Sequence, residues 1–191
     1  PLRLSDFLGG AFWQVFTYMW VHAELYGVLI IHLLFNMLTL YFVGKVVEYR
    51  LGSKPFLWLY LTGGLAAVSF FLVDEGIKGL LLEQAVEMNR PLVGASGAVC
   101  AVLGAFSLMV PDAKVYVMFL PFPIRAITAV KGFVVFSAVA AILGMVPGIA
   151  GAPSWQWLFS IAHSAHLGGI LCGWWMVSQT MKSRRTAPPP I

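Results

Sequence analysis

Residues 91–111 read PLVGASGAVCAVLGAFSLMVP, and this stretch decides the fold. It contains no Asp, Glu, Lys or Arg, and about 20 apolar residues suffice for one helix to cross the hydrocarbon core of a bilayer. The stretch therefore predicts a transmembrane helix. The small residues around Ser96, which are Gly94, Ala95 and Gly97, would let a neighbouring backbone approach closely and leave the serine hydroxyl accessible.

Three further uncharged stretches extend this prediction to the whole chain. They are residues 25–44, 55–73 and 132–181, and the last is long enough for two helices separated by the Pro- and Gly-rich residues 147–154. Five spans are therefore expected. The composition agrees, because 60% of the 191 residues are hydrophobic and 10% are charged, whereas a soluble domain carries about 25% charged residues. The predicted fold class is an all-α membrane protein, a bundle of transmembrane helices.

The composition also excludes other classes of protein and partner. Two cysteines, Cys100 and Cys172, cannot form a disulfide framework, and each lies in an apolar run where a thiol behaves as a small buried hydrophobe. The net charge is +4, but the basic residues are dispersed, so a nucleic-acid partner is not expected. The expected surroundings are a lipid bilayer, and the sequence does not indicate an oligomeric state.

The orientation follows from the Lys and Arg residues of the connections, which gather on the cytoplasmic side of membrane proteins. Alternate connections divide the basic residues nine to three. The nine are Lys45, Arg50, Lys54, Lys114, Arg125, Lys131, Lys182, Arg184 and Arg185. The carboxy terminus is therefore expected in the cytoplasm. A single domain, residues 1–191, would comprise an external interfacial loop at 1–23, a five-helix bundle at 24–181 and a cytoplasmic tail at 182–191, with a first helix missing upstream.

Four polar side chains are expected in one layer of this bundle. His32 and Asn36 lie four residues apart on the first span, so they share one helix face. Ser96 lies near the start of the third span, and His166 lies early in the fifth. These three spans enter the membrane from the outside, so the four side chains fall at a similar depth in its outer half. Strongly polar residues inside a membrane are costly and indicate a function.

Glycines indicate how Ser96 and His166 would meet. Gly169 and Gly173 follow His166 on one helix face, and small residues at this spacing permit close helix packing. If this face packs against the glycines around Ser96 and against Gly104, the imidazole is carried to the serine. A neutral imidazole can take the proton of a serine hydroxyl and so activate it as a nucleophile. The pattern therefore favours a Ser–His dyad.

The remaining polar groups suit acyl transfer, with alternatives left open. His32, Asn36 and the backbone N–H of Ser96 can point at the oxyanion that forms when a carbonyl is attacked. A third, carboxylate member is not expected, because the Asp and Glu residues lie outside the predicted spans or at their edges. Spacing alone does not decide whether His163 or His166 is the base. Each polar group taken singly could also simply hold helices together.

The order of four motifs resembles the rhomboid family of intramembrane serine proteases. The motifs are HLLFN at 32–36, EYRLGS at 48–53, GASG at 94–97, and AHLGG at 165–169 with Gly173. The resemblance implies a six-helix rhomboid-like bundle whose first helix is absent here. It implies Ser96 as nucleophile and His166 as general base, because the family's base precedes the glycine pair. It also implies that no metal or cofactor is needed. The residues matched to the oxyanion site or packed around the dyad are His32, Asn36, Gly94, Gly97, Gly104, Gly169 and Gly173.

Two positions depart from the pattern of this family. Many bacterial members have Trp-Arg in the external loop where this chain reads Trp13-Gln14. The same members often place a Tyr one turn after the nucleophile, where it stacks on the base, and this chain has Cys100 there. Another residue must therefore orient His166, and the loop must be anchored in another way.

The resemblance also implies an activity and its setting. Family members hydrolyse a peptide bond in or beside the transmembrane segment of another membrane protein, so such proteins are the expected substrates. The bacterial plasma membrane is the expected location, with the mitochondrial inner membrane as the alternative, and the site would open to the external side. Residues 147–160 are expected to form a cap or an interfacial anchor, and residues 74–90 a short surface helix. The alternative function is a rhomboid-like protein that binds transmembrane helices without cleaving them.

Overall fold

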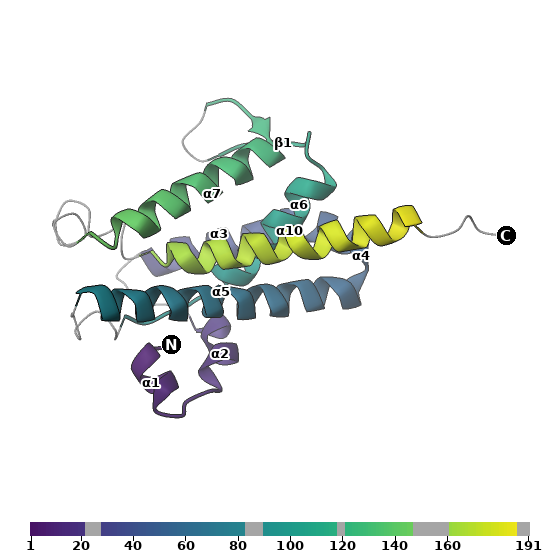
Figure 1. Cartoon of the computed structure of the whole chain (residues 1–191). Helices are drawn as coiled ribbons and strands as arrows, with labels where there is room; N and C mark the ends of the chain where they lie inside the picture. The colour runs from purple at the N-terminus through teal and green to yellow at the C-terminus, as the bar shows by residue number, and fades with distance from the viewer. Residues whose placement is uncertain (22–27, 83–89, 118–120, 147–160, 187–191) are drawn as a thin grey trace.

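The computed structural model describes residues 1–21, 28–82, 90–117, 121–146 and 161–186. Long helices dominate this part of the chain (Figure 1). The helices of the bundle are α3 (Val28–Thr39), α5 (Ser53–Leu82), α6 (Ser96–Met109), α7 (Ala126–Leu143) and α10 (His163–Thr186). Helix α3 continues through the π-helical turn η2 (Leu40–Gly44) into α4 (Lys45–Leu51). The predicted all-α bundle is therefore confirmed.

Helix α6 is the central element of the bundle. It is apolar on every side, and nearly all its residues from Gly97 to Ser107 are buried, as expected for a helix surrounded by others. Helix α10 packs along both α6 and α5, and α7 lies on the other side of α10 from α5 (Figure 1). Three clusters of buried side chains join these helices, and each cluster includes residues of α6 and α10.

Apolar side chains also cover the outside of the bundle. Exposed Leu, Phe and Val side chains follow one another on α3 and on α7, for example Phe35, Leu38, Val135 and Val139. A large exposed apolar surface is unusual on a soluble protein but is expected where helices face lipid. By length and composition, α5 and α7 could each cross a membrane, and α6 is a shorter apolar helix.

The first 20 residues pack against the segment that precedes α6. They form α1 (Leu4–Leu8), α2 (Gln14–Thr17) and the 3₁₀ turn η1 (Tyr18–Trp20). Leu2 and Leu92 exchange two backbone hydrogen bonds, of 2.9 and 2.7 Å. The side chains of Leu2, Tyr18 and Met19 are buried in a cluster with residues of α5. The segment therefore forms part of the folded core rather than a detached loop.

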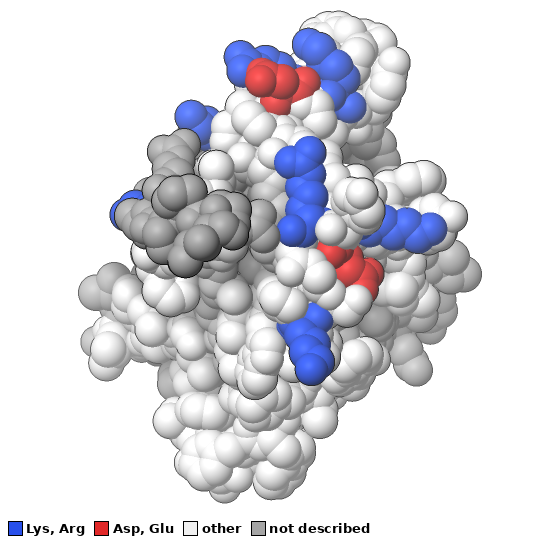
Figure 2. All heavy atoms as spheres, turned by 90° about the vertical axis from the view of Figure 1, so that its right-hand side faces the viewer, with Lys and Arg blue, Asp and Glu red and all other residues white. Residues whose placement is uncertain are grey.

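Basic side chains gather at one end of the bundle. A short antiparallel hairpin, β1 (Lys114–Val115) with β2 (Ile124–Arg125), connects α6 to α7. Figure 2 shows Lys and Arg side chains gathered over the end of the bundle toward which α10 runs. Arg50 ties α4 to the end of α6 there, because its Nη1 donates a hydrogen bond of 2.8 Å to the carbonyl oxygen of Met109. The start of α10 lies at the opposite end (Figure 1).

Two predicted boundaries are wrong. Helix α5 continues past residue 73 to Leu82, so residues 74–82 extend the span instead of forming a separate surface helix. Helix α7 begins at Ala126 rather than at 132 and includes the exposed Lys131. Charged residues limit the predicted spans, but ion pairs within α5 and an exposed lysine on α7 allow both helices to continue. The predicted cap at 147–160 lies outside the described residues.

Candidate active site

Ser96 and His166 lie within hydrogen-bonding distance. Nε2 of His166 is 3.0 Å from Oγ of Ser96, although the two residues are 70 positions apart in the sequence. Ser96 is the first residue of α6, and His166 lies in the first turn of α10. Both side chains are half-buried. The structure therefore places a hydroxyl and an imidazole together where two helices begin.

Glycines make this approach of α6 and α10 possible. A Cβ atom on Gly169 would overlap the carbonyl oxygen of Gly97, and one on Gly173 would overlap the carbonyl oxygen of Ala101. A Cβ on Gly104 would lie 2.6 Å from the carbonyl oxygen of Ile170. These distances are too short for any real side chain, so the two backbones touch directly. The contact between glycine faces that the sequence predicts is present.

Gly94 shapes the turn that leads into Ser96. Its φ angle is +100°, which favours glycine because it has no Cβ. A Cβ at this position would also lie 2.8 Å from Cε1 of His32, so the His32 ring lies directly against the turn. The structure thus brings His32 beside the segment that precedes Ser96.

Asn36 is placed differently from His32. Its side chain is buried, and its Nδ2 donates a hydrogen bond of 3.0 Å to the carbonyl oxygen of His32, one turn earlier in α3. The amide therefore bonds to its own helix. It lies on the same helix as His32, as the spacing predicts, but its observed bond is not directed at Ser96.

The N-terminal segment holds the same turn from the other side. The backbone N–H of Gly94 donates a hydrogen bond of 3.0 Å to the carbonyl oxygen of Tyr18. The hydroxyl of Tyr18 donates one of 2.8 Å to the carbonyl oxygen of Gly64 in α5. Burial raises the pKa of Tyr18 above its usual value of 10.0, because the phenolate would lose its hydration. Tyr18 therefore connects the turn before Ser96 to α5 through its neutral form.

Gln14 anchors the N-terminal segment within itself. Its Oε1 accepts a hydrogen bond of 3.2 Å from the backbone N–H of Arg3, and its Nε2 donates one of 3.4 Å to Oδ2 of Asp6. These bonds join α2 to α1. These bonds explain how the segment is held although Gln14 stands where many bacterial members of the family named above have arginine.

Phe133 of α7 packs against the ring of His166. The two ring centroids are 5.7 Å apart, with 37° between the ring planes. Cys100 lies in the same cluster of side chains as Phe133, so an aromatic ring from another helix contacts His166 in a chain that has no tyrosine at position 100. Nδ1 of His166 makes no hydrogen bond within the described residues. Sequence analysis missed Phe133, because apolar periodicity does not say which residue of a lipid-facing helix turns inward.

His163 is not the histidine found against Ser96. Its ring packs edge-on against Phe136 of α7, with 5.4 Å between centroids, and lies 6.4 Å from the ring of His166. It is His166 whose Nε2 is 3.0 Å from Ser96. The geometry thus separates two residues that the spacing left equivalent.

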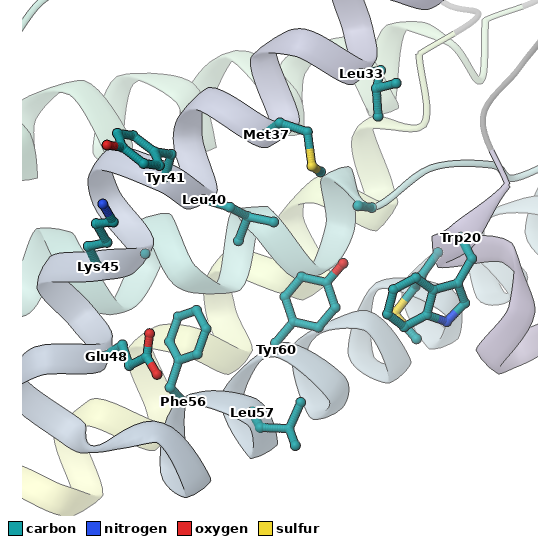
Figure 3. Close-up of a pocket in the computed structure, with 13 residues that line it drawn as sticks. Trp20, Leu33, Met37, Leu40, Tyr41, Lys45, Glu48, Phe56, Leu57 and Tyr60 are labelled. Carbon is teal, nitrogen blue, oxygen red and sulfur yellow. The ribbon is translucent and has the colours of Figure 1, made fainter.

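An apolar pocket of about 620 Å³ lies between the segment 33–48 and α5 (Figure 3). Leu33, Met37 and Leu40 line one wall, and Phe56, Leu57 and Tyr60 of α5 line the other, with Lys45 and Glu48 at one end. The lining includes Ala95, the residue before Ser96, but neither Ser96 nor His166. The pocket therefore lies next to the segment that leads into Ser96 but is not lined by Ser96 or His166.

The sequence of this chain is similar to those of known proteins. Residues 9–183 match the rhomboid domain. Presenilin-associated rhomboid-like protein A, mitochondrial, of Danio rerio is 32% identical over 149 residues, which are 78% of this chain and 33% of that protein. The human presenilin-associated rhomboid-like protein, mitochondrial, is 31% identical over 148 residues, 77% of this chain and 34% of that protein.

A yeast relative gives the same result. Rhomboid protein 1, mitochondrial, of Saccharomyces cerevisiae is 31% identical over 158 residues, 81% of this chain and 40% of that protein. The matched region is thus 33% to 40% of the length of these three relatives. The match to the rhomboid domain covers residues 9–183, which include α3, α5, α6, α7 and most of α10. The chain therefore belongs to the rhomboid family.

Proposed function

We propose that this protein is a serine endopeptidase that hydrolyses peptide bonds in or next to transmembrane segments of other membrane proteins. The observation that carries the proposal is the 3.0 Å distance between His166 Nε2 and Ser96 Oγ at the start of two helices. Family membership supports it, because rhomboid proteins are generally intramembrane serine proteases. Ser96 is the proposed nucleophile and His166 the proposed general base.

The proposed reaction has two stages. His166 Nε2 accepts the hydroxyl proton as Ser96 Oγ attacks the carbonyl carbon of the substrate, and it returns this proton to the leaving amine. This leaves an acyl group on Ser96. Water then attacks the ester carbonyl while His166 Nε2 takes a proton from it, and His166 returns this proton to Ser96 Oγ as the bond between Oγ and the acyl carbon breaks and the carboxylic acid product leaves. For the first step the imidazole is neutral, with its proton on Nδ1, so that Nε2 is free to accept.

The start of α6 is suited to stabilise the oxyanion. The first N–H groups of a helix have no partner within the helix, and the positive end of the helix dipole favours negative charge. The first intrahelical bond here runs from the N–H of Val99 to the carbonyl oxygen of Ala95. The backbone N–H of Ser96 is therefore one proposed oxyanion donor, and His32 beside Gly94 is another. Asn36 would contribute after its amide leaves the carbonyl oxygen of His32.

The proposed orientation places the basic end of the bundle, toward which α10 runs, on the cytoplasmic side of the membrane. The start of α10, which carries His166, lies at the end of the bundle opposite this basic end (Figure 1), so the site would open to the external side under the positive-inside rule. A bacterial plasma membrane fits this arrangement. The mitochondrial inner membrane is the alternative, and the names of the relatives, which are mitochondrial proteins, favour it.

A second candidate function is the binding of transmembrane helices without cleavage. The pocket between α3 and α5 favours it, because most of its wall is apolar (Figure 3), and side chains of another membrane helix fit such a surface. In this case the contact between Ser96 and His166 would be structural. The two functions predict different effects of removing the Ser96 hydroxyl.

Replacement of Ser96 with Ala separates these two functions. A protease loses cleavage of a transmembrane substrate but still binds it, because Ala retains the shape of the site and lacks only the nucleophile. The measurement is cleavage and co-purification of one substrate with the wild-type protein and with Ser96→Ala in the same vesicles. Ser69→Ala is the control, because the exposed Ser69 hydroxyl bonds to the carbonyl oxygen of Leu65 in the preceding turn of α5. Binding with no cleavage by the wild-type protein would contradict the protease and support the second function.

A further inference from the structure

A buried group of charged residues at the end of α5 takes no part in the mechanism above. Asp74, Glu75 and Lys78 are 6%, 2% and 8% exposed. Lys78 Nζ lies 2.9 Å from Asp74 Oδ2 and 3.7 Å from Glu75 Oε1, and Arg90 Nη2 lies 3.3 Å from the same Glu75 oxygen. Two carboxylates and two cations thus balance one another. Because burying such a group is costly and adds little net stability, its presence in a membrane helix indicates a function.

This charged group contacts α10 through Ser164. The hydroxyl of Ser164 donates a hydrogen bond of 2.9 Å to Asp74 Oδ2, and both side chains are buried. Ser164 lies in the first turn of α10, which closes when the N–H of His166 donates to the carbonyl oxygen of Ala162 at 3.2 Å. The bond between Ser164 and Asp74 therefore joins α5 to the turn that carries His166.

The carboxylate of Asp74 is well suited to this contact. Negative charge is stabilised near the N-terminus of a helix, and α10 begins at His163. A hydrogen bond to an ionised acceptor is roughly twice as strong as one between neutral groups. A cavity of only about 10 Å³ separates Asp74 and His163 from residues at the end of α7, such as Ala140 and Gly144. Residues of α5, α7 and α10 thus meet around Asp74.

Two kinds of contact fix α10 on either side of His166. After His166, Gly169 packs against α6, and Gly168 packs against the carbonyl oxygen of Ala66 in α5. Glycine contacts set the distance between helices, but they have little directional preference. A hydrogen bond weakens steeply when its angle changes, so the bond from Ser164 fixes the rotation of the first turn. The ring of His166 has no such bond at Nδ1 to any residue that the structure describes.

We propose that Asp74 is a positioning residue for His166. It accepts the hydrogen bond of Ser164, fixes the first turn of α10 and so holds His166 Nε2 at bonding distance from Ser96 Oγ. Lys78 Nζ, which lies 2.9 Å from the same Asp74 oxygen, holds the carboxylate in place for this contact. The inference rests on the proposed function, because it concerns the reactivity of Ser96.

Ser164→Ala tests this inference with a small, neutral change. The rate at which a fluorophosphonate labels Ser96 is expected to fall about 10- to 100-fold, the effect of misplacing a catalytic group by about 1 Å. Ser164→Thr keeps the hydroxyl and is expected to label within about threefold of the wild-type rate. Ser178→Ala is the matched control on the same helix, because the Ser178 hydroxyl bonds to the carbonyl oxygen of Trp175 in its own helix. This variant should label at the wild-type rate.

A second readout does not depend on catalysis. In protein with isotope-labelled histidine, the NMR signals of the His166 ring are expected to shift in Ser164→Ala and in Asp74→Asn, but not in Ser178→Ala. Unchanged labelling in Ser164→Ala, or labelling that Ser164→Thr does not restore, would overturn the inference. If wild-type Ser96 is never labelled, the proposed function fails, and the His166 signals then decide the inference alone: a shift in Ser164→Ala supports it, and no shift overturns it.

Discussion

Replacement of His166 with Ala is expected to lower the rate of substrate cleavage by about 10³-fold or more, whereas replacement of His163 with Gln should lower it by less than about tenfold. The two histidines lie three residues apart on α10. A ring nitrogen of His166 lies 3.0 Å from Ser96 Oγ, whereas the ring of His163 packs against Phe136. A general base must reach the proton that it removes, so the loss should follow this geometry.

The measurement is the initial rate of cleavage of one transmembrane substrate by each purified variant in vesicles. Gln retains the size and polarity of His163, so its packing against α7 is largely preserved. Thermal unfolding of each variant shows whether a lost activity reflects a lost fold. A wild-type rate of cleavage by His166→Ala would show that His166 is not the base. A greater loss in His163→Gln than in His166→Ala would indicate His163 instead.

Gly169→Ala is expected to lower the cleavage rate by about 100-fold, although alanine adds only one methyl group. This methyl would overlap the carbonyl oxygen of Gly97, so α10 must move away from α6. The movement separates His166 from Ser96, and overpacking of this kind also costs about 1–3 kcal/mol of stability. The thermal unfolding temperature should therefore fall together with the rate.

Gly132→Ala is the matched control for this prediction. Gly132 lies within α7, and a Cβ there would meet no atom within 4 Å. Alanine favours a helix over glycine by about 1 kcal/mol, so this variant should be as stable as the wild type or more so, with the same cleavage rate. Equal losses in both variants, or wild-type activity in Gly169→Ala, would show that direct contact between the α6 and α10 backbones does not set the site.

Much of the fold follows from the sequence because a bilayer imposes simple rules. Uncharged stretches of sufficient length must be helices, since only helices and closed barrels satisfy their backbone groups in lipid. The position of Ser96 relative to His166 follows almost as directly. Gly97, Gly104, Gly169 and Gly173 leave room for two backbones to touch, and the polar residues then meet at the same level.

The features that were not predicted depend on packing between distant segments. The predicted spans end at charged residues, so the sequence predicts Asp74 outside the helix. The i, i+4 spacing of Asp74 and Lys78 was the available signal that both could continue inside α5 as an ion pair. No local pattern indicates that Phe133 rather than another residue of α7 would reach His166, because this depends on how α7 is rotated against α10.

The central claim is that the Ser96 hydroxyl is activated by His166. It is tested most directly by treating the wild-type protein and His166→Ala with a fluorophosphonate and mapping the modified residue by mass spectrometry. If His166 activates Ser96, an adduct is expected on Ser96 of the wild-type protein and little or none in His166→Ala. An adduct at another residue, no adduct on Ser96 of the wild type, or equal labelling of both proteins would contradict it.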